Sequence, residues 1–318
     1  MIVKIKKIRK RMAKVQKRSY NVRFRNSRSM LFKHLCDHDY SQKILTHLAG
    51  GIEKELFIAS LKNLSDKGNP LRFNNFAYCM REIIGIILDK YSDDVDIKRC
   101  QWFIQADDTD VTRVQRVTYA ICGGMSRDYV KENILENEDD EENLLDKTLK
   151  SFNKKFRILS VYTHVRAEKN FNISNVLCEK LTLDVLKITN DIVSLIEDCR
   201  KEIQSKVYEK ISNAVIDESL QSTLDGLDIL STHGYVEYVN ISEYEVSTIT
   251  SQHIIIDGSG NASCTLEWGS GSDFRNDNGA TMNEEFPLKF RAHISVNNLD
   301  DVSIFEGDID INNESWFQ

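Results

Sequence analysis

The segment from residue 174 to residue 224 constrains the fold of this chain more than any other feature of its sequence. Apolar residues recur there every three to four positions, with many charged residues between them, which is the pattern of an amphipathic helix. The whole chain of 318 residues has only two prolines, so little interrupts its helices. The pattern predicts either one long helix or a hairpin of two. Periodicity does not separate these alternatives, although this length without a cap favours a break or a coiled-coil-like partner.

The same periodicity predicts further helices before this segment, and a change in composition predicts strands after it. The helices are expected over residues 35–63, 74–91, 112–122 and 144–165. Turn residues at 65–70 and the pair Gly123-Gly124 end two of them, and residues 92–110 are expected to be irregular. From about Ser231 onward, short β-branched segments alternate with Gly, Asn, Asp and Ser clusters, which predicts strands at 235–249, 253–256, 262–268, 288–296 and 302–311.

These patterns predict an α+β protein with three regions. A basic N-terminal arm covers residues 1–34, a helical bundle covers residues 35–225, and a small antiparallel β domain covers residues 231–318. The arm holds thirteen Lys or Arg residues and no acid. Removing these thirteen from the 42 basic residues leaves 29 against 49 acids, so the body has a net charge of −20 although the whole chain has −7.

The arm has two interpretations. Such arms attract nucleic-acid phosphates without regard to sequence, and we then expect contacts from residues such as Lys7 and Arg11. Alternatively, the arm lies on the acidic surface of its own protein or is a flexible solubilising end. Charge alone does not decide between the two.

Several classes of protein are excluded. No apolar run reaches the roughly 18 residues of a membrane span, and the seven scattered cysteines form no C-x-x-C pair, so we expect a soluble cytoplasmic protein without disulfides or zinc. The P-loop, G-x-G-x-x-G, H-E-x-x-H and G-x-S-x-G motifs are absent. We expect no cofactor and no metal site. A Mg-dependent nuclease stays as an alternative, and it would require several carboxylates near Lys289 to converge within about 4 to 5 Å of one point; these are Asp273, Asp277, Glu284 and Glu285.

Arg157 and His164 are the strongest candidates for catalysis. Seven helical steps separate them and come within about 20° of two full turns, so both lie on one helix face about 10 Å apart, provided that the helix extends that far. A histidine transfers protons near neutral pH, and a guanidinium binds phosphate and stabilises the negative charge of a pentacoordinate phosphorus. The alternative is that His164 only favours the dipole at a helix C-terminus.

Two resemblances extend this interpretation. The Arg157/His164 spacing resembles the motif of HEPN ribonucleases, which are all-helical. Four stretches in order, NPLRFNNFAYCMRE (69–82), TRVQRVTYAICGG (112–124), YTHVR (162–166) and LEWGSGSD (266–273), resemble bacterial proteins described as predicted PIWI-associating nucleases. Together they imply that the helical region is HEPN-like and that the chain is a metal-independent endoribonuclease in anti-phage or mobile-element defence. They further imply a homodimer that acts on RNA, with an Argonaute-like or sensor protein as a possible partner.

Other polar residues complete the candidate site, each with a structural alternative. Glu82 is a further catalytic candidate, although with Arg81 it could form a structural ion pair. Arg113 and Arg116 lie three residues apart and could bind phosphate or offset the acidic loop before them. Arg72 and Asn75 could line the same cleft or belong to a helix cap. The alternative to an enzyme is a non-enzymatic module that binds nucleic acid and a partner protein. In that alternative, an edge of the sheet could pair with a strand of the partner. The predicted nucleic-acid contacts are Arg72, Asn75, Arg81, Arg113, Arg116, Lys7 and Arg11.

Overall fold

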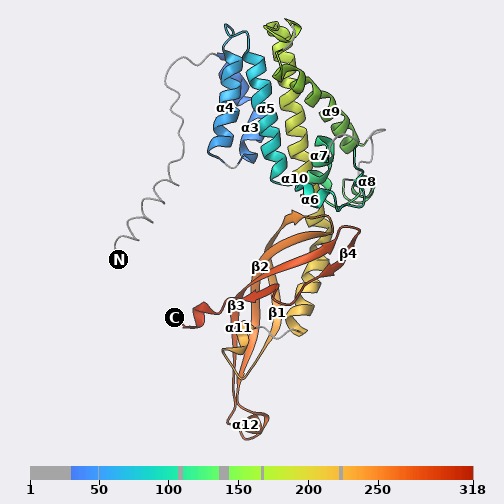
Figure 1. Ribbon diagram of the computed structural model, residues 1–318. Helices are drawn as coiled ribbons and strands as arrows, with labels where there is room; N and C mark the ends of the chain where they lie inside the picture. The colour runs from blue at the N-terminus through green and yellow to red at the C-terminus, as the bar shows by residue number, and fades with distance from the viewer. Residues whose placement is uncertain are drawn as a thin grey trace, which may run out of the picture.

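The computed structural model describes residues 30–48, 50–106, 110–135, 143–165, 168–221 and 225–317 (Figure 1). Nearly all of the basic arm, including Lys7 and Arg11, lies outside these residues. The described chain is an α+β protein in which a bundle of helices is followed by a five-stranded antiparallel sheet, as the sequence predicted. None of the described helices is long and apolar enough to cross a membrane.

Helix α10 (Asn175–Gln221) is a single helix of 47 residues, which decides between the two alternatives for this segment. In Figure 1 it runs from the bundle down along the sheet. Its first half packs on the bundle, where Glu197 lies 3.5 Å from Lys43. Its second half packs on the sheet, where Gln204 Nε2 donates to the Tyr244 carbonyl at 2.5 Å. Because α10 packs on both parts, the division of the chain into domains at residues 225–231 stays a prediction.

The bundle contains more separate helices than the periodicity predicted. The single helix predicted over 35–63 was wrong, because His38 caps a new helix and because Gly50 and Gly51 have φ angles of 128° and 55°, a region that favours glycine. The predicted helices at 74–91, 112–122 and 144–165 are confirmed within two residues. The helices before α10 are α2 (Met30–Asp37), α3 (Asp39–His47), α4 (Ile52–Ser65), α5 (Arg72–Asp89), α6 (Asp94–Ile97), α7 (Arg113–Cys122), α8 (Arg127–Asn133) and α9 (Leu144–Thr163).

The sheet has the order β1-β2-β3-β4, with β5 paired to β3. The two strands predicted at 253–256 and 262–268 form one strand, because Gly258 and Gly260 do not break it. A Cβ at Gly258 would lie 2.3 Å from the Phe290 ring, so glycine there lets the ring cross the strand. The predicted strand at 302–311 is two strands. The strands are β1 (His233–Ile249), β2 (His253–Trp268), β3 (Ala280–Ser295), β4 (Asn298–Ser303) and β5 (Ile309–Ile311). The short helix α11 (Asp225–Asp228) precedes β1, and the short helix α12 (Gly271–Arg275) joins β2 to β3.

The long edge strand β1 carries three irregularities. Its register with β2 shifts at Glu237, Ser242 and Ser247, so an extra residue enters the strand at every fifth position. Such bulges increase the twist of a strand and interrupt the row of hydrogen-bonding groups at its edge. They therefore disfavour the addition of a partner strand at β1, which the binding-module alternative requires at a sheet edge.

The bundle and the sheet also meet at the turn between β1 and β2. Gly124 N donates to the Thr250 carbonyl at 2.9 Å, and the Trp102 indole N–H donates to the Gly123 carbonyl at 3.0 Å. Trp268 similarly donates to the Leu230 carbonyl at 2.9 Å. Both tryptophans are thus structural anchors. All seven cysteines lie in the described residues and are free thiols.

Candidate nucleic-acid interface

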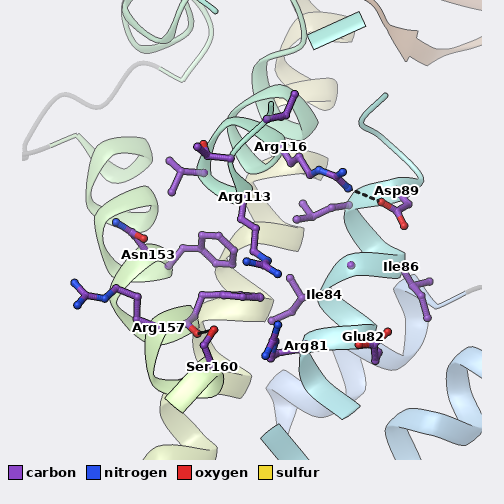
Figure 2. Close-up of a pocket in the computed structure, with 17 residues that line it drawn as sticks. Arg81, Glu82, Ile84, Ile86, Asp89, Arg113, Arg116, Asn153, Arg157 and Ser160 are labelled. Carbon is purple, nitrogen blue, oxygen red and sulfur yellow. Dashed lines mark hydrogen bonds and ion pairs between the residues drawn. The ribbon is translucent and has the colours of Figure 1, made fainter. Parts of the chain in front are cut away.

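Four arginines from three helices surround one cavity in the bundle. Arg81 comes from α5, Arg113 and Arg116 from α7, and Arg157 from α9, and they line a cavity of about 680 Å³ that we call the arginine groove (Figure 2). Glu82 and Asp89 are the acidic residues among its lining, so the formal charge of the groove is positive. Its apolar lining comprises Ile84, Ile86, Leu88, Val111, Val114, Phe152 and Phe156. The groove therefore combines cationic donors with apolar surface, as sites for single-stranded nucleic acids do.

Local structure fixes where the α7 arginines lie. Thr112 and Gln115 form a capping box, in which the Thr112 hydroxyl accepts from Gln115 N at 3.2 Å and the Gln115 side chain accepts from Thr112 N at 2.7 Å. Because the helix begins there, Arg113 and Arg116 lie in its first turn. The positive end of the helix dipole adds to their charge at the groove.

The four arginines differ in how their charges are balanced. Arg116 forms ion pairs with Asp89 at 3.1 Å and with Asp94 at 2.6 Å. Arg81 Nη1 donates to the neutral Thr163 hydroxyl at 2.7 Å. Arg157 is exposed and has no ion-pair partner among the residues that the structure describes.

Arg113 is exposed, but its guanidinium has an aromatic ring and two other cations as neighbours. Its guanidinium carbon lies 4.5 Å from the centroid of the Phe156 ring, a cation–π contact. Burial lowers the pKa of the Arg113 guanidinium, and the positive charges of Arg81 and Arg116 lower it further. In Figure 2 the guanidinium of Arg113 lies between α5 and α9, whereas that of Arg157 points away from α5. An anion in the groove would relieve the repulsion around Arg113.

The sequence predicts Arg157 and His164 on one helix face, provided that the helix extends to His164. The helix ends one residue before it. Helix α9 ends at Thr163, and His164 is its C-cap residue with extended backbone angles of −114° and 101°. His164 is exposed and does not line the groove. Residues near it in the sequence do contact the groove, because Thr163 accepts a hydrogen bond from Arg81 and Ser160, one turn earlier, lines the cavity.

Two predicted contacts, Arg72 and Asn75, lie outside the lining of the groove. Arg72 is buried, and its Nη2 donates to the Asn175 side chain at 2.5 Å. The neighbouring Asn74 is also buried, and its Nδ2 donates to the carbonyls of Tyr162 and Asn170 at 2.7 and 3.0 Å. Both side chains therefore hold the connection between α9 and α10 in place. Asn75 is half-buried beside them.

Some residues of the groove escaped the sequence interpretation. Asn153 and Ser160 line it together with Arg157, and the intervals of four and three residues place all three on one face of α9. That spacing was a usable signal. Asp89 and Phe156 could not be found in this way, because their roles depend on contacts with α7.

The carboxylates proposed for a magnesium site do not converge. The Asp273 carboxylate caps α12 and accepts from Ser270 N at 2.6 Å. Glu284 and Glu285 are consecutive in β3 and point to opposite faces of the sheet. Within the described ranges, no group of three or more His, Cys, Asp or Glu residues could hold a metal ion. The requirement for the Mg-dependent alternative is therefore not met.

The fold and site define an α+β protein with a cationic groove between helices. Two family models match the chain, over residues 45–189 and 196–317, and each is described as predicted pPIWI-associating nuclease. The first match covers the groove and the second begins within α10 and covers the sheet. Over both of its parts, the chain therefore matches the family of predicted pPIWI-associating nucleases. No curated protein and no solved structure gives a significant match.

Proposed function

We propose that this protein is a metal-independent endoribonuclease that holds the RNA backbone in the arginine groove. The family matches support a nuclease. The observation that carries the proposal is that Arg81, Arg113 and Arg157, which come from three different helices, line one cavity. Guanidinium groups bind phosphate in a planar, bidentate geometry. This interaction is stronger where the site excludes water.

The proposed chemistry uses Arg157 and Glu82 from the lining of the groove and the exposed His164 outside that lining. His164 removes the proton of a ribose 2′-hydroxyl, and the 2′-oxygen then attacks the adjacent phosphorus. The bond to the 5′-oxygen breaks, that oxygen takes up a proton, and the products are a 2′,3′-cyclic phosphate and a 5′-hydroxyl. Arg157 stabilises the charge of the pentacoordinate phosphorus. Glu82, which lines the groove and is exposed, is the second proton-transfer group in this proposal.

The proposal includes a HEPN-type homodimer in bacterial defence against phages or mobile elements. Its structural support comes from the described residues 161–165, which include His164, and 168–177, at the end of α9 and the beginning of α10. Five large apolar side chains in these two ranges are exposed: Val161, Val165, Phe171, Val176 and Leu177. Apolar surface concentrated in this way is typical of interaction sites. The pPIWI-associating name of the family agrees with an Argonaute-like partner.

The direct test is cleavage of a labelled single-stranded RNA in excess EDTA. We expect wild-type protein to produce 2′,3′-cyclic phosphate ends, and His164→Ala to lower the rate by about 10²- to 10⁴-fold, as removal of a general acid or base does. Arg157→Gln should lower the rate while His164 remains. Lys62→Gln, which changes an exposed α4 lysine outside the groove, is the matched control. Activity that disappears in EDTA but survives His164→Ala would contradict this mechanism.

One observation favours a second function. The arginine groove is formed although His164 does not line it, so the groove could bind nucleic acid without cutting it. In that case the protein is a binding module of a defence system. The same preparation distinguishes the two, because a binding module retains RNA with a steep salt dependence and yields no cleavage product. Matched single-stranded DNA, which lacks the 2′-hydroxyl, separates binding from chemistry in either case.

A further inference from the structure

A second cavity lies beside the arginine groove on α9. It measures about 420 Å³, and its lining includes Lys150, Lys154, Val161 and Tyr162. Asn153 and Arg157 line both cavities. The two cavities are therefore adjacent, with Arg157 at their boundary. We call this second cavity the α9 cavity.

The cationic side chains of the α9 cavity follow a regular spacing along the helix. Lys150, Lys154 and Arg157 are separated by four and three residues, so they lie on one face, about 5 Å apart along the helix axis at each step. All three are exposed. In Figure 2 the guanidinium of Arg157 points away from α5, and Arg157 lines both cavities. The row thus continues the positive charge of the groove along the outside of α9.

The chemistry of the two cavities favours an extended strand with repeated negative charges. Each cavity combines cations with accessible apolar surface, from the half-buried Ile86, Val111 and Val114 in the groove and from Val161 and Tyr162 in the α9 cavity. Phosphates match the cations, and unpaired bases match the apolar surface. The paired bases of a duplex cannot reach such surface, since they are stacked on one another. A single phosphorylated group would require the groove alone.

We infer that the protein binds single-stranded nucleic acid along a path that crosses Arg157 from the arginine groove into the α9 cavity. This inference rests on the proposed function for the phosphate site of the groove, and it adds the strandedness of the substrate and a second binding site. Arg157 then contacts the phosphate at the boundary, with bound nucleotides on both sides. Lys150 and Lys154 contact the backbone beyond it.

The test measures how the affinity of the full chain depends on salt. Fluorescence anisotropy is recorded with a 12-nucleotide RNA, a 4-nucleotide RNA and a 12-base-pair RNA duplex. The variant Lys150→Gln with Lys154→Gln removes two cations from the α9 cavity, and Lys62→Gln with Lys67→Gln is the control for loss of charge at exposed residues outside both cavities. Both variants change only exposed side chains, and circular dichroism checks their folding.

We expect the α9 variant to flatten the slope of log K against log salt, measured with the 12-nucleotide RNA, by about 0.7 for each phosphate that it no longer neutralises. Its affinity for that RNA should fall at least several-fold, and its affinity for the 4-nucleotide RNA should change much less. The control should keep the wild-type slope. The inference is overturned if the α9 variant also keeps that slope, or if the wild type binds the duplex as tightly as the single strand. Binding with these properties but without cleavage would reject the catalytic proposal alone.

Discussion

Asp96 accepts two hydrogen bonds from Ser251, a residue 155 positions further along the chain. The Ser251 amide donates to Oδ2 at 2.8 Å and the Ser251 hydroxyl donates to Oδ1 at 2.6 Å, while the Tyr119 hydroxyl also donates to Oδ2. Asp94 in the same short helix pairs with Arg116 of the arginine groove. Helix α6 therefore connects the β1–β2 turn with Arg116 and Tyr119 of α7, and through it the sheet is linked to the groove.

Asp96→Asn should destabilise the folded protein. The amide of asparagine cannot accept the three hydrogen bonds in the same arrangement, and a partly buried donor left without its partner costs about 1 to 3 kcal/mol. We expect a loss of this size in the free energy of unfolding, measured in urea. Ser251→Ala should cost less, since it removes one hydroxyl and keeps the backbone donor. A variant as stable as the wild type would show that this contact does not hold the two parts together.

The same residue predicts an acid-sensitive stability. Burial raises the pKa of Asp96, but the hydrogen bonds from Ser251 and Tyr119 lower it by more, so the net pKa lies below its usual value. The unfolded chain then takes up the proton first as the pH falls. The contribution of Asp96 is therefore fully present above about pH 4 and is lost as the pH falls through the lowered pKa. Melting temperatures between pH 6 and pH 3 should fall less steeply in Asp96→Asn than in the wild type. Equal slopes would contradict the prediction.

Gly124→Ala should destabilise the protein at the same junction. A Cβ at Gly124 would lie 2.1 Å from the Ser251 carbonyl oxygen, which is a backbone atom and can move only with the β1–β2 turn. We expect a loss of about 1 to 3 kcal/mol in urea unfolding, as for other overpacked positions. Gly85→Ala is the control, because a Cβ at this position inside α5 would have no atom within 4 Å apart from its chain neighbours and the nearby backbone of α5, and it should stabilise by roughly 0.5 to 1 kcal/mol. If both variants lose stability equally, the close approach is not the reason.

The sequence predicted the helices that line the groove better than it predicted how these helices pack around it. Periodicity located α5, α7 and α9, and charge marked Arg81, Arg113 and Arg157 as candidates. Whether these arginines line one cavity depends on how three helices pack, and local sequence patterns do not predict that packing. The position of His164 inside or outside α9 depends on where the helix ends to within one residue. Helix ends are the part of a helix that sequence patterns locate least well. The pair Gly123-Gly124 predicts a helix stop, and Gly123 is the C-cap of α7. The close approach of Ser251 to Gly124 is a tertiary contact that this local pattern does not predict.

Arg113 and Arg116 should contribute unequally to nucleic-acid binding. Asp89 and Asp94 already balance the charge of Arg116, whereas burial lowers the pKa of Arg113 and the positive charges of Arg81 and Arg116 lower it further. A phosphate gains more from an unbalanced cation, because an existing ion pair must first be disrupted or shared. Arg113→Gln should therefore weaken binding of a 12-nucleotide RNA more than Arg116→Gln does, in anisotropy titrations at several salt concentrations.

Asp89→Asn tests the same electrostatic argument in the opposite direction. The substitution removes a negative charge from the lining of the groove and leaves Arg116 with Asp94 as its remaining partner. Affinity for RNA should rise, and the salt dependence should become steeper by up to about one phosphate contact, roughly 0.7 in the slope for a single strand. Asp66→Asn, at an exposed loop outside both cavities, controls for the change in net charge. If Asp66→Asn raises affinity as much as Asp89→Asn, the gain comes from the overall charge of the protein and the groove has no special share in binding.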